Sequence, residues 1–153
     1  MNQQRKYLRM NLVRLELLKP IEEFSQIRIT HMKEKMIKKG FWIRPICIEE
    51  KYWLILDGHH RYNVAKQLGY KYLPCEFFDY NDENLVVWSL RKDCIVTKKL
   101  VIEKSLNGNI YPYKTAKHKF PILIDKCMIP LNELQKYNRY DHDIIEFDWK
   151  HKI

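Results

Sequence analysis

Apolar positions follow two different periods along the first 80 residues of the chain. Short apolar runs predict strands at 13–18, 45–48, 52–56 and 72–78, and helical spacing predicts helices over 27–39 and 59–68. A glycine follows each helix, as is common where a helix ends. A polar link between the second and third strands suits a hairpin. The chain order is therefore strand, helix, hairpin, helix and strand, a compact α+β (mixed α/β) unit.

The pattern is less regular after residue 80. Segments 85–90 and 122–124 predict strands, 94–106 predicts a helix, and 130–134 is expected to begin a small helix. We therefore expect residues 1–80 to form one core and residues 81–153 to form a small C-terminal α/β extension.

The strand expected at 52–56 ends in the densest group of reactive side chains in the sequence. Asp57-Gly58 is followed at once by a helix, and a helix N-terminus presents unpaired N–H groups that bind phosphate well. Asp57, His59, His60 and Arg61 beside a buried strand are costly unless they bind something charged. The alternative, in which Asp57 is only the N-cap of the helix, leaves the other three side chains unexplained.

Two further polar segments carry candidate chemistry. Glu22 and Glu23 lie between a strand and a helix, and at most one of these neighbours is expected to face a site. Both also suit the start of the next helix through its dipole. Segment 113–118 carries two lysines, a hydroxyl and an imidazole. It suits an anion, and by itself it is also typical of a basic surface loop.

Composition limits the classes of protein and partner. The net charge of +9, from 28 Lys and Arg against 19 Asp and Glu, suits nucleotides, phosphorylated metabolites or nucleic acid. Four cysteines lie far apart without metal-ligand spacing, so we expect buried reduced thiols. The N-terminus is polar, and no apolar run approaches the roughly 18 residues that a membrane span needs. The sequence therefore predicts a cytoplasmic protein with no membrane contact. The sequence contains neither a P-loop nor a G-x-S-x-G nucleophile turn.

The motif Asp57-Gly58-His59-His60-Arg61 resembles the D-G-x-H-R motif of the ParB/sulfiredoxin superfamily, within its free serine kinase branch. Pro20-Ile21-Glu22 is similar to the upstream element of that branch, and Trp88 with 112–118 is similar to its downstream part. The similarity extends over residues 12–124. Sulfiredoxins carry a nucleophilic cysteine where this chain has His59, and the G-E-R-R-type motif of ParB partition proteins is absent.

This resemblance implies a nucleotide-binding core that transfers a phosphoryl group from ADP or ATP to free L-serine, giving O-phospho-L-serine. It implies that Glu22 is the base and that Asp57 holds Mg²⁺ or the serine hydroxyl. It further implies phosphate binding by Gly58, His59, His60 and Arg61, and substrate binding by Trp88, Lys114, Thr115 and His118. The C-terminal extension would complete the substrate pocket.

Two alternatives remain at the level of sequence. One is a non-catalytic nucleotide- or DNA-binding regulator on the same scaffold, which the net charge of +9 also suits. The other is a kinase for another small hydroxyl compound, such as threonine or homoserine, because resemblance of fold does not identify a substrate.

Overall fold

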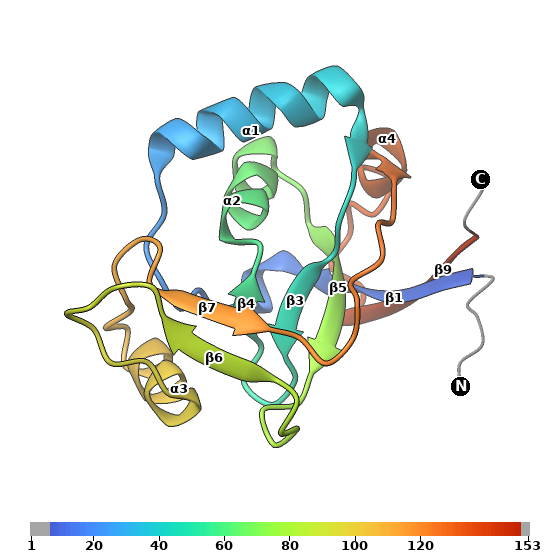
Figure 1. Cartoon of the computed structure of the whole chain (residues 1–153). Helices are drawn as coiled ribbons and strands as arrows, with labels where there is room; N and C mark the ends of the chain where they lie inside the picture. The colour runs from blue at the N-terminus through green and yellow to red at the C-terminus, as the bar shows by residue number, and fades with distance from the viewer. Residues whose placement is uncertain (1–6, 151–153) are drawn as a thin grey trace.

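The computed structural model describes residues 7–150, and its centre is a five-stranded mixed sheet (Figure 1). The strand order is β4 (Leu54–Asp57), β3 (Ile46–Glu49), β5 (Tyr72–Phe78), β1 (Tyr7–Arg14) and β9 (Ile144–Lys150). Strands β3 and β5 are parallel, and the other neighbouring pairs are antiparallel. The apolar runs of β3 and β4 are buried, as expected of strands that are covered on both faces.

Two helices, α1 (Gln26–Lys39) and α2 (His59–Leu68), pack on each other above the sheet in Figure 1. Helix α1 begins after Ser25, whose hydroxyl accepts a hydrogen bond from the N–H of Arg28, and it ends at Gly40. Ile29 and Met36 are buried in the core, whereas Ile37 is 53% exposed. Both helices predicted for the first 80 residues are confirmed.

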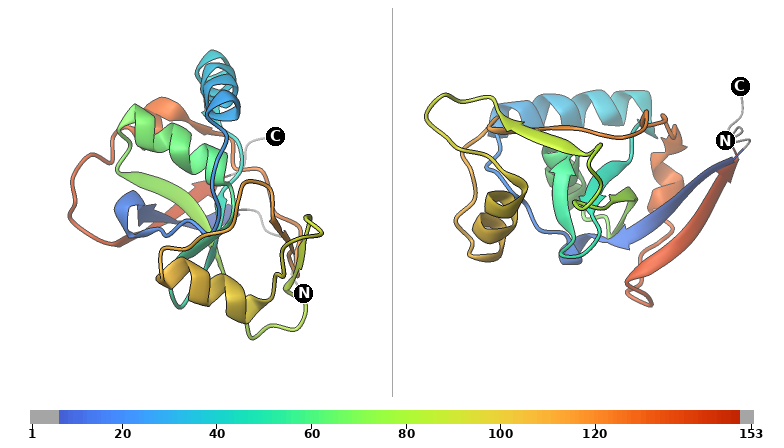
Figure 2. Two further views of the ribbon diagram at one scale, coloured as in Figure 1. Left: turned by 90° about the vertical axis from the view of Figure 1, so that its left-hand side faces the viewer. Right: turned by 60° about the horizontal axis from the view of Figure 1, so that its bottom comes forward.

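A smaller sheet lies beside β4, and in it β6 (Val86–Ser89) pairs antiparallel with β7 (Ala116–Lys119). Helix α3 (Lys98–Leu106) lies at the opposite end of the molecule from α1 (Figure 2). Leu85 and Val101 belong to an apolar cluster that also contains Leu56 of β4 and Phe78 of β5. The C-terminal residues therefore pack directly against the strand that leads to Asp57.

The remaining elements connect the end of the chain to the core. Strand β2 (Phe41–Trp42) pairs with β8 (Ile129–Pro130), and the small helix predicted near residue 130 is present as α4 (Leu131–Leu134). Strand β9 pairs with β1 from Val13↔Ile144 to Tyr7↔Lys150, and the two strands run out together in Figure 2. Residues beyond position 80 thus complete the sheet, while the division of the chain at residue 80 stays a prediction.

Three predicted elements are wrong in position. Strand β1 ends at Arg14, and residues 15–17 form a 3₁₀ helix where the strand was expected to continue. Helix α3 begins only at Lys98, because the hydroxyl of Thr97 caps it by accepting from the N–H of Leu100. Segment 122–124 is not a strand: Ile122 and Leu123 are exposed, and only Ile124 packs against the core.

The expected reduced thiols are present. All four cysteines are free; Cys47, Cys75 and Cys127 are buried, and Cys94 is half-buried. No helix within residues 7–150 is long and apolar enough to cross a membrane.

Candidate active site

The turn between β4 and α2 depends on a glycine. Gly58 has a φ of 109°, a conformation that L residues rarely adopt. A Cβ atom at this position would lie 2.7 Å from Cδ1 of Ile46 and 3.1 Å from Nη2 of Arg61. Gly58 is itself the N-cap of α2, and no side chain caps the helix, so Asp57 is not the cap considered above. The first amides of α2 are therefore left for a ligand.

Glu22 reaches the same place from another part of the chain. It forms a parallel bridge with Tyr111, which brings it beside the loop that leads into β7. Its Oε2 accepts hydrogen bonds from the amides of Thr115, at 3.2 Å, and Ala116, at 2.9 Å. Because a carboxylate has about four acceptor positions, these bonds hold the group and leave capacity for a substrate.

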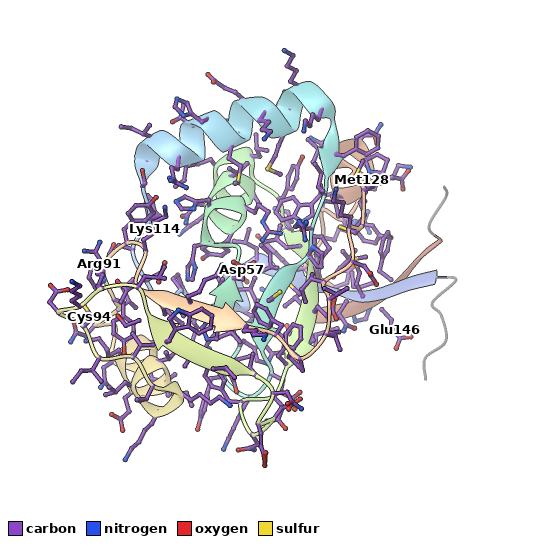
Figure 3. The ribbon with its side chains drawn as sticks, viewed as in Figure 1. Asp57, Arg91, Cys94, Lys114, Met128 and Glu146 are labelled. Atoms are coloured by element: carbon purple, nitrogen blue, oxygen red, sulfur yellow. The ribbon has the colours of Figure 1, made fainter. Side chains whose placement is uncertain are left out.

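One cavity of about 260 Å³ joins the two parts of the chain. Its wall contains Glu22, the whole turn Asp57–Arg61, and Lys114. Figure 3 shows Asp57 at the end of β4, below α2, with Lys114 on the neighbouring loop. Glu22 and the turn that begins at Asp57, which are 35 residues apart in the sequence, thus line one pocket.

Burial raises the pKa of Glu22, although the amides of Ala116, Thr115 and Lys114 and the charge of Arg91 act in the opposite direction. A carboxyl whose proton affinity is raised in this way is a stronger base. This is the type of shift that is common among groups that exchange protons with a substrate.

Both histidines of the turn are neutral near pH 7. Burial lowers the pKa of His59 to about 3, and burial together with the charges of Arg28 and Lys114 lowers the pKa of His60. The Nε2 of His59 accepts from the N–H of Ile21 at 3.1 Å, and the Nε2 of His60 accepts from the N–H of Ser25 at 3.4 Å. In a neutral ring this leaves Nδ1 as the protonated donor. The histidines therefore connect the turn to the segment that carries Glu22.

The guanidinium of Arg61 holds the backbone before β3. Its Nη1 donates to the carbonyls of Arg44, at 2.7 Å, and Pro45, at 3.0 Å. Its Nη2 lies 3.4 Å from Oδ2 of Asp57. Most of its hydrogen-bonding capacity is thus used within the protein, so Arg61 orients Asp57 and keeps only part of its guanidinium free for a ligand.

The fold brings further cations to the pocket. Arg28 of α1 and Lys117 of β7 line the pocket, and Arg91 donates to the carbonyl of Tyr113 beside it. Sequence reasoning missed Arg28 and Arg91, and it included Lys117 only as part of the basic segment 113–118. With Arg61 and Lys114, the wall holds four cations (Arg28, Arg61, Lys114 and Lys117) against two carboxylates (Glu22 and Asp57). Arg28 had a signal in the sequence, since a cation in the first turn of a helix opposes the dipole unless an anion binds there.

Three of the residues expected to bind substrate are not part of the pocket wall. Trp88 lies on β6 and is 41% exposed. The hydroxyl of Thr115 donates to the carbonyl of Pro112, and buried His118 lies with its Nε2 2.7 Å from the hydroxyl of Tyr80. Direct substrate contact by these three residues stays a prediction, and their observed contacts are structural.

Residues 1–93 match the family described as the ParB N-terminal domain. The chain belongs to this family. An ATP-dependent L-serine kinase of Staphylothermus marinus is 38% identical over 79 residues, which are 48% of this chain and 31% of that protein. The ADP-dependent L-serine kinase SerK of Thermococcus kodakarensis is 28% identical over 81 residues, 50% of this chain and 34% of that protein. The chain thus spans about a third of the length of these curated relatives.

Comparison of structures gives the same fold over most of the chain. The free serine kinase in complex with AMP superposes with a TM-score of 0.74 at 18% identity, covering 87% of this chain and 95% of that one. At this identity the likeness establishes the fold. The α+β, ParB/sulfiredoxin-like fold expected from the sequence is confirmed.

Proposed function

We propose that this protein transfers a phosphoryl group from ADP or ATP to the hydroxyl of free L-serine, giving O-phospho-L-serine. The observation that carries the proposal is the single pocket lined by both Glu22 and the turn Asp57–Arg61. A serine hydroxyl is a poor nucleophile, so transfer needs a base beside it and positive charge around the phosphoryl group. The names of the matched relatives support the same reaction.

Glu22 is the base in this proposal. Backbone amides hold its Oε2, and burial raises its pKa, so it accepts the hydroxyl proton as the oxygen attacks phosphorus. Glu23 does not fit this role, because it is exposed and lies outside the cavity wall.

The nucleotide phosphates bind at the N-terminus of α2. The turn at Gly58 lets them approach the backbone amides, and the Nδ1–H groups of His59 and His60 add donors. Arg28 adds charge where the phosphoryl group moves. The nucleoside occupies the adjoining hollow of about 400 Å³, which shares Arg28 and His60 with the pocket.

Mg²⁺ fits this site as an ion that arrives with the nucleotide. No group of three or more His, Cys, Asp or Glu among the described residues could hold a metal ion. Protein-bound Mg²⁺ usually takes one or two carboxylates together with substrate phosphates, and Asp57 offers an exposed carboxylate beside the phosphate site. When bound, the ion neutralises charge on the transferring phosphoryl group.

The carboxylate of serine is assigned to Lys114 and Lys117, which line the pocket near Glu22. Thr115 and His118 position other groups in this proposal. The amide of Thr115 holds Glu22, and His118 fixes β7 through its contact with Tyr80. Trp88 pairs with Lys117 across the small sheet, so it lies next to the part of the pocket that is assigned to serine.

The test is to incubate the purified protein with L-serine, Mg²⁺ and either ADP or ATP, and to measure O-phosphoserine by mass spectrometry. We expect phosphoserine with at least one donor, and parallel reactions with threonine and homoserine identify the acceptor. Absence of any phosphorylated amino acid, together with steeply salt-dependent binding to duplex DNA, would show a regulator in place of a kinase.

A further inference from the structure

A second cavity, of about 290 Å³, lies between the C-terminal half of α1 and the segment that joins β2 to β3. It shares Met32 and Arg61 with the active-site pocket, and Met32 and Lys35 with the hollow assigned above to the nucleoside. The reaction proposed above uses none of the residues that are unique to it, which are Met36, Lys39, Ile43 and Arg44.

The wall of this second cavity combines an apolar surface with positive charge. Met32, Met36 and Ile43 supply the apolar part. Lys35, Lys39, Arg44 and Arg61 supply four cations, and no acidic residue lines the cavity. This composition is complementary to a molecule that has an apolar body and a negative group.

Most of these charges have no partner within the protein. Among the described residues, Arg61 pairs with Asp57, whereas Lys35, Lys39 and Arg44 enter no ion pair. Lys35 and Lys39 are four residues apart on α1, a spacing at which like charges repel. The helix dipole favours a cation in the last turn, where Lys39 lies, but Lys35 lies before that turn and gains no such stabilisation. A bound anion would relieve this repulsion.

Arg61 separates the two cavities. Its guanidinium is tied to the carbonyls of Arg44 and Pro45 and lines both spaces. A ligand on the Lys39 side therefore touches the same group that pairs with Asp57 on the other side. The volume of about 290 Å³ is near the lower end of small-molecule sites, which are about 300–1,000 Å³.

We infer that this cavity binds a small organic anion with an apolar body, at a site separate from that of the nucleotide. The inference stands on the residues around Lys39 and Arg44 and does not depend on kinase activity. An anion bound there contacts Arg61 in the wall of the active-site pocket, and a role for it as an effector rests on the proposed function.

The probe for this site is 1-anilinonaphthalene-8-sulfonate, an aromatic anion whose fluorescence rises in apolar surroundings. We would titrate it into the wild type, into K39A/R44A, and into the matched control K33A/K38A. Both pairs remove two cations, but Lys33 and Lys38 line none of the described cavities. Removal of two charge contacts should raise the probe's dissociation constant about tenfold in K39A/R44A and leave the control unchanged.

Competition with nucleotide separates this site from the active site. Saturating ADP or ATP should leave the bound probe in place. Displacement of the probe by nucleotide in proportion to occupancy would assign the cavity to the nucleotide site and overturn the inference. Equal probe affinity in K39A/R44A and the wild type would overturn it as well, whatever the outcome of the serine assay.

Discussion

Glu22 acquires its properties from contacts that are distant in sequence. Two amides at positions 115 and 116 hold its carboxylate, and burial raises its pKa. Its neighbour Glu23 has the same chemistry and points to solvent. At the scale of single residues, position decides which carboxylate can serve as a base.

Glu22→Gln should lower the turnover number for serine phosphorylation by about 10²–10⁴-fold, because a positioned base contributes roughly that factor. Affinity for nucleotide should be retained, since the proposed phosphate site is the N-terminus of α2 and not Glu22. Steady-state kinetics and calorimetric titration with ADP and ATP measure the two effects. Glu23→Gln is the matched control and should behave as the wild type; full activity in Glu22→Gln would remove Glu22 from the base role.

Arg61→Lys should weaken nucleotide binding and lower the free energy of unfolding by about 1–2 kcal/mol. An ammonium group cannot reproduce the planar fork that now serves Arg44, Pro45 and Asp57. Urea denaturation and calorimetric titration are the measurements. Lys66→Arg, at an exposed position on the same helix, should be neutral. Unchanged stability together with unchanged affinity in Arg61→Lys would contradict this account.

At the scale of elements, the site is the junction of a buried strand and a helix N-terminus. Strand β4 ends at Asp57, the chain turns at Gly58, and α2 begins with amides that no side chain caps. The loop before β7 closes the opposite side, and its last residue, Thr115, together with the first residue of β7, Ala116, supplies the amides that hold Glu22. The geometry of the turn therefore matters as much as the side chains that it carries.

Gly58→Ala tests the turn. A Cβ at this position would lie 2.7 Å from Ile46, and alanine would be strained at the φ of 109° that the turn requires. We therefore expect both lower stability and weaker nucleotide binding. Gly69→Ala, with φ of 78° and nothing within 4 Å of the added atom, carries the strain of positive φ without the clash. Urea denaturation should show the larger loss in Gly58→Ala, by about 1–3 kcal/mol. Equal losses of stability in the two variants would show that the close contact between position 58 and Ile46 does not affect stability.

At the scale of the whole molecule, the fold places two histidines where they stay neutral. His59 is part of the active-site turn, at the start of α2, and His118 lies on β7 with its ring against Tyr80. Burial is the first cause that lowers the pKa of each to about 3, from an ordinary value of 6.5. Protonation of either ring therefore opposes folding.

Stability should fall as the pH decreases from about 6.5 toward 3. In that window the unfolded chain binds protons that folded His59 and His118 do not, so the free energy of unfolding rises with pH. Each histidine contributes a slope of up to about 1.4 kcal/mol per pH unit. Urea midpoints at pH 7, 6 and 5 measure the trend, and histidine proton NMR should show both rings still neutral at pH 5.

The control for this pH dependence is His31→Gln, because His31 is exposed on α1. This variant should keep the slope of the wild type. Constant stability between pH 7 and 5, or titration of His59 near pH 6.5 in the native protein, would contradict the proposed burial.

Local sequence was sufficient for the helices and for the chemistry of the central turn. Apolar spacing and the terminal glycines Gly40 and Gly69 placed α1 and α2 correctly, because helix periodicity and end signals are local. Strand β9 and strand β7 were missed, because each depends on a partner far along the chain. The family resemblance, carried by the motif at Asp57–Arg61, pointed to the fold that the structure has.

The sequence by itself determined the turn from β4 through Gly58 into α2, because the buried run, the glycine and the start of the helix are encoded within a few residues. Only the tertiary structure decided which groups face that turn: it brought Glu22, Arg28 and Lys117 to one cavity and turned Trp88 and His118 away from its wall. The physical reason is that these approaches depend on long-range strand pairing and burial. Pairing of that kind leaves no periodic signal in the segments that take part in it.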